Sequence, residues 1–412
     1  MVDKRFIKNL DYTLILAVLL IICFSLIIIS SATLVSSPKD FRQYQEILTK
    51  DTPGLNGGIT DQPVDISIVT YVKVFFSDIV KKQILFVFLS ILILIFILSV
   101  PYEDFRRHRR TIYLMNLVLL LIVLSPLGHA AKGATRWINL GPFLLQPSEF
   151  AKISIIITFA DFLARREGKL NSFKELIPCF VHIGIPMLLI LKQPDLGTSL
   201  VFIAITFGML FTAGANPKLV TGLFVGGWVS AIGWVWGHFR FGLWIPLKDY
   251  QLDRLLVFID PWKQWRGAGY QVVQSQIAIG SGGLSGKGIY NGSQNQLNFL
   301  PEQHTDFIFS VVGEELGFIG VTVLLLLFFI VLYRAIRIAS QAKDLYGALL
   351  ATGVASMLTF HILINVGMVS GIMPVTGVPL PLFSYGGSSM MTNMISIAIL
   401  LNVYLRRQKI LF

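Results

Sequence analysis

Long apolar stretches, each close to twenty residues, recur along the chain and alternate with shorter polar segments. A helix needs about 20 apolar residues to cross a bilayer, so each stretch predicts one membrane span. The predicted spans are 12–33, 83–101, 111–128, 148–164, 175–192, 197–214, 217–237, 306–334, 346–370 and 385–405. The first is too long to be the apolar region of a signal peptide, and further spans follow it. The pattern predicts an all-α polytopic membrane protein of about ten transmembrane helices, with residues 1–412 as a single membrane domain.

The composition supports this interpretation and excludes several classes of protein. The chain of 412 residues is 54% hydrophobic and 14% charged, whereas a soluble domain is roughly one-quarter charged. The two cysteines, Cys23 and Cys179, both lie in apolar spans, so a disulfide framework is not expected. The histidines show no paired spacing typical of a zinc site, and we predict no metal site built from protein ligands alone.

Lysine and arginine indicate how the chain is oriented in the membrane. With ten spans, the main basic clusters fall on one side, at residues 4–8, 106–110, 165–174, 334–343 and 406–409. Cytoplasmic loops carry an excess of these residues, so both termini are predicted to be cytoplasmic. The net charge of +11 is mostly this basic belt. It suits anionic headgroups of membrane lipids, and no nucleic-acid partner is predicted.

Four segments rich in glycine, proline and polar residues then face the outer side: 129–152, 192–199, 239–306 and 370–389. The large loop 239–305, between the seventh and eighth spans, is predicted to carry catalysis, whereas the long first outer loop, 34–75, has no chemical motif. Irregular backbone at membrane depth is tolerated only where protein buries it or where it lines a wet cavity. We therefore predict an outward-open polar cavity.

Asp306 is the strongest catalytic candidate, because it lies where the large polar loop enters an apolar span. Charges at membrane depth are costly, so a carboxylate there is a functional-site hypothesis. Glu302 and His304 precede it, and Glu314 follows within the apolar run. We predict that these three residues contact substrate.

Several residues of the first polar segment are candidates for binding an anionic substrate. Arg136 and Lys152 suit a phosphate clamp, since a guanidinium offers two parallel donors and an ammonium offers a point charge. Glu149 lies one helical turn from Lys152, so an internal ion pair between them is the alternative. Trp137 is either a platform for a sugar ring or an aromatic residue at the membrane interface.

The other polar segments contribute candidates with equally plain structural alternatives. Asp195 either lines the cavity or caps the sixth span, and Gln274 and Ser275 either bind sugar or peptide groups or are solvated in a loop. The sequence around Lys287 lacks the spacing of a nucleotide-binding loop, so its glycines are predicted to allow tight turns and the lysine to be a third cation. The tenth helix should begin near Ser384, either offering N–H groups to an anion or simply reversing the chain.

Five motifs resemble the SEDS family (shape, elongation, division and sporulation) of membrane glycosyltransferases, over roughly residues 10–405. They are RWINLGPFLLQPSEFAK, QPDLGTS, GYQVVQSQIAIGSGGLSGKG, FLPEQHTDFIFSVVGEELGFIG and PVTGVPLPLFSYGGSS. Their wording is more similar to the elongation branch, RodA, than to the division branch, FtsW. One departure is that Gln264 and Trp265 stand where the family often has a second Asp-Pro pair.

The resemblance implies a peptidoglycan glycosyltransferase of the bacterial inner membrane that polymerises lipid II at the outer leaflet during elongation. It implies Asp306 as the essential acid, which we interpret as the general base. A divalent cation, Mg²⁺ or Mn²⁺, is expected only as one bound with the substrate diphosphate. A lipid II flippase and a non-catalytic scaffold of the wall-synthesis complex are the alternatives.

The resemblance also implies a partner, a class B penicillin-binding protein of the elongation complex that supplies transpeptidation. We expect its transmembrane helix to pack against spans 306–334 and 346–370. Small residues such as Ala351 and Gly353 are the predicted contact positions.

Overall fold

The computed structural model describes residues 10–33, 77–131, 134–139, 141, 143–245, 247–264, 267–297 and 299–407. The predicted first outer loop, 34–75, lies outside these ranges. The elements in chain order are α2 (Tyr12–Ala32), α5 (Asp78–Ser99), α6 (Tyr102–Arg107), α7 (Arg109–Leu124), β1 (Gly128–Ala131), β2 (Ala134–Asn139), β3 (Leu144–Leu145), α8 (Pro147–Ala164), α9 (Phe173–Lys192), α10 (Leu196–Thr212), α11 (Pro217–Phe241), α12 (Asp249–Ile259), η1 (Pro261–Gln264), α13 (Ala268–Ser281), α14 (Ser293–Gln296), α15 (Ile308–Ser340), α16 (Leu345–Val369) and α17 (Gly387–Leu405).

Each of the ten predicted apolar stretches forms a helix. Within the described ranges, seven helices are long and apolar enough to cross a membrane: α2, α5, α9, α11, α15, α16 and α17. The helix α7 is shorter, with 16 residues, and α10 has 17. The helix α8 carries three charged residues, Glu149, Lys152 and Asp161, which lower its hydropathy. A total of ten membrane spans therefore stays a prediction.

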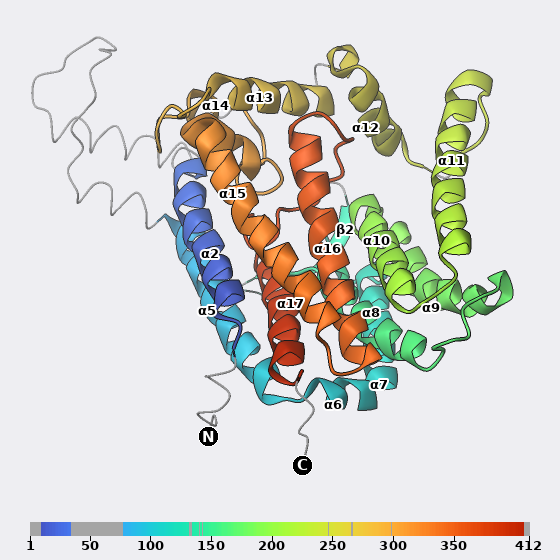
Figure 1. The fold of residues 1–412 in the computed structure, drawn as a ribbon. Coiled ribbons are helices and arrows are strands. Elements are labelled where there is room, and N and C mark those ends of the chain that lie inside the picture. The colour runs from blue at the N-terminus through green and yellow to red at the C-terminus, as the bar shows by residue number, and fades with distance from the viewer. Residues whose placement is uncertain are drawn as a thin grey trace, which may run out of the picture.

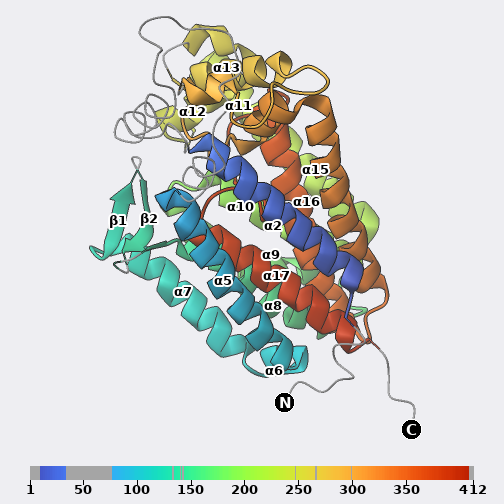
Figure 2. The ribbon, with the colours of Figure 1, turned by 90° about the vertical axis from the view of Figure 1, so that its left-hand side faces the viewer.

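The expectation of an all-α fold needs one correction, because the first polar segment forms a small antiparallel sheet. The strand order is β1-β2-β3, with Gly128 opposite Ile138 and Ile138 opposite Leu145. The strands are too short to show an alternating pattern long enough to recognise in the sequence. Figure 2 shows the sheet beyond one end of α7, at the edge of the helix bundle.

The helices α16 and α17 form the centre of the bundle (Figures 1 and 2). The helix α16 packs against α15, α10 and α8, and α17 packs against α5 and α8. At the other extreme, α11 stands at the edge and is almost entirely exposed. The many small and polar residues of α16 and α17 explain their central place, since small side chains let helices approach closely in a membrane.

The predicted partner contacts at Ala351 and Gly353 are wrong. Both residues are buried, and a Cβ added at Gly353 would lie 2.8 Å from Ile156 Cγ2 and 2.9 Å from Met209 Sδ. Gly353 therefore faces α8 and α10 inside the bundle, and Ala351 is buried in the same helix. Sequence alone could not separate small residues that pack helices within one chain from those that would contact a second chain.

The helix α15 is broken at Gly317, where φ is +61° and ψ is −157°. A Cβ at this position would come within 2.8 Å of the Leu284 carbonyl carbon, so the break brings a glycine against another backbone. The loop 283–288 replaces the missing helical hydrogen bonds. Four bonds do so: Lys287 N to Glu314 O (3.0 Å), Gly288 N to Glu315 O (2.9 Å), Phe318 N to Gly283 O (2.9 Å) and Ile319 N to Leu284 O (3.1 Å). The prediction of tight turns in this glycine-rich motif is confirmed, and the turns serve to join the loop to the helix.

The two ends of the bundle differ in character. Figure 1 shows α12, α13 and α14, from the large loop, at one end, and α6 with the start of α2 and the end of α17 at the other. The basic residues of α6 and the start of α7 therefore lie far from the loop that leads to Asp306. This separation matches the division of the sequence into basic and glycine-rich polar segments.

Candidate active site

The four predicted polar segments meet at one end of the bundle. Three contacts show this: a Cβ at Gly197 would lie 2.7 Å from Val378 Cγ2, Gln146 N donates to Ser388 Oγ (3.0 Å), and Ser384 Oγ donates to Thr305 O (2.6 Å). Segment 370–389 takes part in all three contacts. Segment 370–389 therefore brings the other three segments together beside Asp306, the residue after Thr305.

The backbone at Asp306 is held by a buried asparagine from the bundle. Asp306 is half-buried two residues before α15, and its carbonyl oxygen accepts a hydrogen bond from Asn365 Nδ2 (2.9 Å). The same amide donates to Val378 O (2.8 Å), and Asn365 is fully buried in α16. One side chain thus fixes Asp306 relative to segment 370–389. Buried polar groups need partners, which explains an asparagine in an apolar span.

The carboxylate of Asp306 and the guanidinium of Arg254 converge on Gly377. A Cβ built at Gly377 would lie 3.4 Å from Asp306 Oδ2 and 3.8 Å from Arg254 Nη1, and Gly377 has a φ of +73°. The positive φ favours glycine here, and a Cβ would meet the two side-chain ends at ordinary van der Waals distance. The arrangement places a proton acceptor next to a donor fork suited to phosphate oxygens.

Arg254 was missed in the sequence, although it lies on α12 within the predicted catalytic loop. More than fifty residues separate it from Asp306, and only the tertiary fold brings them together. The available signal was a cation in the loop that precedes the acid. The predicted cations Arg136, Lys152 and Lys287 lie in the motifs that resemble the family, whereas Arg254 lies outside those motifs.

The turn before Asp306 contains two more predicted site residues. Glu302 has a φ of +57°, and its Oε2 accepts a hydrogen bond from Thr305 Oγ1 (3.1 Å). The carbonyl oxygen of His304 accepts from Tyr385 N (3.0 Å), and the two rings lie 5.6 Å apart. Both residues therefore lie in the turn that leads to Asp306. Their contact with substrate stays a prediction.

Glu149 and Lys152 form an ion pair inside the bundle. Lys152 Nζ lies 2.7 Å from Glu149 Oε1 and 3.2 Å from Nε2 of His361 on α16, and all three side chains are buried. The structure thus has the internal ion pair, which was one of the two interpretations. A role of Lys152 in binding phosphate stays a prediction and would require this cluster to open.

Arg136 and Asp195 lie together near the start of α10. Asp195 caps that helix by accepting from Thr198 N (3.2 Å), so the capping interpretation is confirmed in the structure. The guanidinium of Arg136, on β2, donates to the carbonyl oxygens of Gln193 (3.2 Å) and Pro194. Trp137 is half-buried on the same strand. Arg136 therefore holds the chain that leads into the cap, and the phosphate-binding role stays a prediction.

The Glu314 carboxylate fastens the large loop to α15. Its Oε1 accepts from Lys287 Nζ (2.8 Å), Ser293 Oγ (3.2 Å) and Gln294 N (2.9 Å), and its Oε2 accepts from Asn295 N (3.3 Å). The Glu314 side chain is only 1% exposed, and that of Lys287 is 29% exposed. Contact of Glu314 with substrate, as predicted, would have to replace one of these bonds.

Ser275 and Ser384 have comparable positioning roles. Ser275 is fully buried, donates to Val369 O (2.7 Å) and lies 2.7 Å from Ser310 Oγ, so it joins α13 to α15 and α16. Gln274 beside it is half-buried. The helix α17 begins at Gly387, three residues after Ser384, which is buried and bonded to residue 305. Substrate contacts of these residues stay predictions.

Within the ranges that the structure describes, no group of three or more His, Cys, Asp or Glu side chains is arranged to hold a metal ion. This finding concerns protein ligands only. A cation bound partly by substrate phosphates would need fewer protein ligands.

Comparison with known sequences gives relatives over most of the chain. The model of the FtsW/RodA/SpoVE family, described as cell cycle protein, matches residues 64–409. Stage V sporulation protein E of Bacillus subtilis is 39% identical over 78% of this chain and 86% of its own length. A probable peptidoglycan glycosyltransferase FtsW of Geobacter metallireducens is 39% identical over 79% of this chain and 84% of its own length. The peptidoglycan glycosyltransferase MrdB of Escherichia coli is 38% identical over 78% of this chain and 84% of its own length.

Solved structures share the fold over nearly the whole chain. One solved structure comes from work on the structural coordination of polymerization and crosslinking by a peptidoglycan synthase complex. Its chain is 29% identical to this one, with a TM-score of 0.73. The match covers 97% of this chain and 99% of that one. A mutant of the rod shape determining protein RodA of Thermus thermophilus is 26% identical, with a TM-score of 0.64 and the same coverage.

Proposed function

Because the chain belongs to the FtsW/RodA/SpoVE family of cell cycle proteins, we propose that it polymerises lipid II into glycan strands with Asp306 as the general base. The chain is a peptidoglycan glycosyltransferase, as its curated relatives are named, and a multi-pass protein of the bacterial inner membrane. The substrate, the role of each site residue and the orientation in the membrane are our proposal.

One observation carries the assignment of the base: Asp306 Oδ2 and Arg254 Nη1 lie within 4 Å of a single point beside Gly377. Asn365 holds the backbone on both sides of that point. The backbone that carries Asp306 is therefore held beside Gly377, and a preorganised charge lowers a reaction barrier without reorganisation during the reaction.

The chemistry needs one proton acceptor and a means of stabilising a leaving diphosphate. The acceptor hydroxyl attacks the anomeric carbon of the donor sugar, and the bond from that carbon to the diphosphate oxygen breaks with its electron pair. The hydroxyl proton passes to the Asp306 carboxylate. A diphosphate is already a good leaving group, so a general acid is dispensable, and a single displacement inverts the anomeric carbon.

Arg254 is our first candidate for the cation that binds the diphosphate, because it is close to Asp306 and its guanidinium can bind two oxygens at once. Lys287, Arg136 and Lys152 are further candidates, and each would have to exchange the contacts that it makes in this structure. A divalent cation, if the reaction uses one, would neutralise charge on the diphosphate itself. Its binding stays a prediction.

We propose that the enzyme acts at the outer leaflet during cell elongation. The basic clusters of the sequence support the orientation, with both termini cytoplasmic. The wording of the FLPEQHTDFIF and GVPLPLFSYGG motifs favours the RodA branch. Relatives named FtsW, MrdB and stage V sporulation protein E are almost equally identical to the chain, so the branch rests on the motifs.

We further propose that a class B penicillin-binding protein is the partner, since polymerised strands need crosslinking and the neighbouring structure is a complex that couples the two activities. Its transmembrane helix would pack on α15, which exposes an apolar stripe at helical spacing: Phe318, Leu326, Phe329, Tyr333 and Ile336. Paired Phe329→Ala and Tyr333→Ala changes should weaken co-purification. The same changes at Val181 and Leu188, equally exposed on α9, provide the control.

The test of function is incubation of the purified chain with lipid II, with and without the partner, followed by electrophoresis of the glycan products. Strands should form with the chain and be uncrosslinked unless a transpeptidase is active. A flippase would instead move lipid II across a vesicle membrane without forming glycosidic bonds. Transport of lipid II with no glycan strand formed, although the partner is bound, would contradict the proposal. Glycan strands formed by the partner in the absence of this chain would contradict it too.

A further inference from the structure

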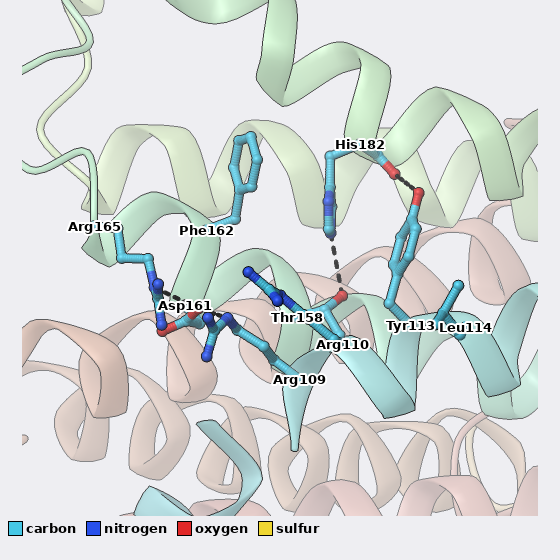
Figure 3. Close-up of a pocket in the computed structure, with 9 residues that line it drawn as sticks. All are labelled: Arg109, Arg110, Tyr113, Leu114, Thr158, Asp161, Phe162, Arg165 and His182. Atoms are coloured by element: carbon cyan, nitrogen blue, oxygen red, sulfur yellow. Dashed lines mark hydrogen bonds and ion pairs between the residues drawn. The ribbon is translucent and has the colours of Figure 1, made fainter. Parts of the chain in front are cut away.

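A pocket of about 450 Å³ lies between α7, α8 and α9 at the basic end of the molecule (Figure 3). Its walls come from the first turns of α7, the last turns of α8 and the middle of α9. This end carries α6, the start of α2 and the end of α17, whereas α15, which follows Asp306 in the chain, begins at the other end. The reaction proposed above therefore does not use the pocket.

The charge around the pocket is unbalanced. Asp161, at the end of α8, is 1% exposed and forms ion pairs of 2.8 Å with each of three guanidiniums, from Arg106, Arg109 and Arg165. One carboxylate neutralises one of three cations, and two positive charges remain in excess. Figure 3 shows Arg109 and Arg165 gathered around Asp161 on one side of the pocket.

Arg110 adds a fourth cation. It lines the pocket, and Figure 3 shows its side chain extending from α7 toward Thr158 and Phe162. Among the residues that the structure describes, we find no hydrogen bond or ion pair for the Arg110 guanidinium. Guanidiniums bind phosphate oxygens through parallel donors, so this set of arginines fits a phosphate group.

The opposite wall is apolar and aromatic. The His182 ring is stacked between Tyr113 at 4.4 Å and Phe162 at 4.8 Å, and its Nε2 lies 3.2 Å from Thr158 Oγ1. His182 is thus satisfied within the protein and offers a flat surface. Leu114, which also lines the pocket, is 60% exposed. Because α7 borders the apolar outer surface, the pocket opens toward the acyl chains of the bilayer.

We propose that this pocket binds an anionic phospholipid, with the phosphate on Arg110 and the excess arginines around Asp161 and with an acyl chain along Leu114 and Tyr113. A free phosphate ion would satisfy the charge but leave the apolar wall exposed to water. A zwitterionic phospholipid would cover that wall but bring a cation toward the arginines. The combination of a cationic and an apolar wall selects a lipid that has both an anionic headgroup and acyl chains.

The test measures lipid binding to the full-length protein in detergent by native mass spectrometry. The probes are dioleoyl-phosphatidylglycerol, dioleoyl-phosphatidylcholine and inorganic phosphate. Arg110→Gln is the test variant, because this exposed side chain lies outside the Asp161 ion pairs and its loss should not affect folding. Arg107→Gln is the matched control, since Arg107 is an exposed neighbour that does not line the pocket.

We expect Arg110→Gln to weaken phosphatidylglycerol binding about fivefold, the change that corresponds to roughly 1 kcal/mol per basic residue at an anionic membrane surface. Arg107→Gln should bind like the unmodified protein, and phosphatidylcholine should bind weakly to all three. An equal loss of phosphatidylglycerol binding in Arg110→Gln and Arg107→Gln would overturn the proposal. Equal binding of phosphatidylglycerol and phosphatidylcholine to the unmodified protein would overturn it as well. Full displacement of phosphatidylglycerol by an equal concentration of inorganic phosphate would show an ion site and would overturn it too.

Discussion

Three carboxylates, Asp306, Glu314 and Glu315, lie close together in the chain but have different surroundings. Glu314 and Glu315 are fully buried. The Glu314 carboxylate accepts hydrogen bonds from loop 287–295, and Glu315 Oε1 accepts from Ser31 Oγ (2.5 Å) and Asn295 Nδ2 (3.0 Å). Asp306 is half-buried and shares the space beside Gly377 with a guanidinium. The comparison teaches that an acid in an apolar region can be structural or reactive, and that the exposure of its side chain separates the two.

Replacing Asp306 should have the largest effect on activity. In Asp306→Asn the side chain keeps its size but cannot accept a proton, so lipid II polymerisation should fall by roughly 10²–10⁴-fold. The melting temperature in detergent should change little. Polymerisation within a few-fold of the unmodified enzyme, by a well-folded Asp306→Asn protein, would show that another group is the base.

Replacing Glu314 should affect stability instead. Glu314→Gln leaves Lys287 without its buried counter-charge and replaces one acceptor oxygen with an NH₂ donor, which should cost about 3 kcal/mol of folding free energy. The protein that remains folded should polymerise lipid II at nearly the normal rate. Glu302→Gln, at a half-buried glutamate of the same region, should cost less stability. A Glu314→Gln enzyme that is fully stable but inactive would assign Glu314 to catalysis, and Glu314 would then not differ in role from Asp306.

Arg254 tests whether the cation beside Asp306 acts on the substrate. Arg254→Ala should lower kcat/KM by about 10–100-fold, because a preorganised positive group is lost where charge develops. Arg254→Lys should recover part of the activity, since a point charge replaces the fork. If Arg254→Ala reduces only the melting temperature, the arginine is a structural partner of the site.

Gly377 provides the smallest and most specific test. Gly377→Ala would place a methyl group in van der Waals contact with Asp306 and Arg254, in the space where we propose that substrate meets them, so activity should fall about tenfold. Gly168 has the same φ of +73°, but a Cβ there would meet nothing within 4 Å. Gly168→Ala therefore reports backbone strain alone. Equal activity of the two variants would mean that the space beside Gly377 is not part of the active site.

The helices of this fold could be predicted well because lipid imposes a simple requirement. Each of the ten apolar stretches is a helix, and the boundaries of α16 agree with the predicted span to within one residue. The sheet of β1, β2 and β3 was missed, because its strands are too short for a pattern and only their mutual pairing defines them. The break at Gly317 was also missed, since a glycine in an apolar helix gives no sign of the loop that packs against it.

The sequence by itself determined the helical membrane class, the clustering of polar motifs and the candidacy of Asp306, because a charge next to an apolar span stands out in one dimension. Only the tertiary structure decided which groups accompany it. Arg254 and Gly377 come from distant segments, Lys152 faces Glu149 and His361 within the bundle, and Glu314 is enclosed by its own loop. Side-chain partners depend on distances across the fold, and the order of residues along the chain does not contain those distances until the helices have packed.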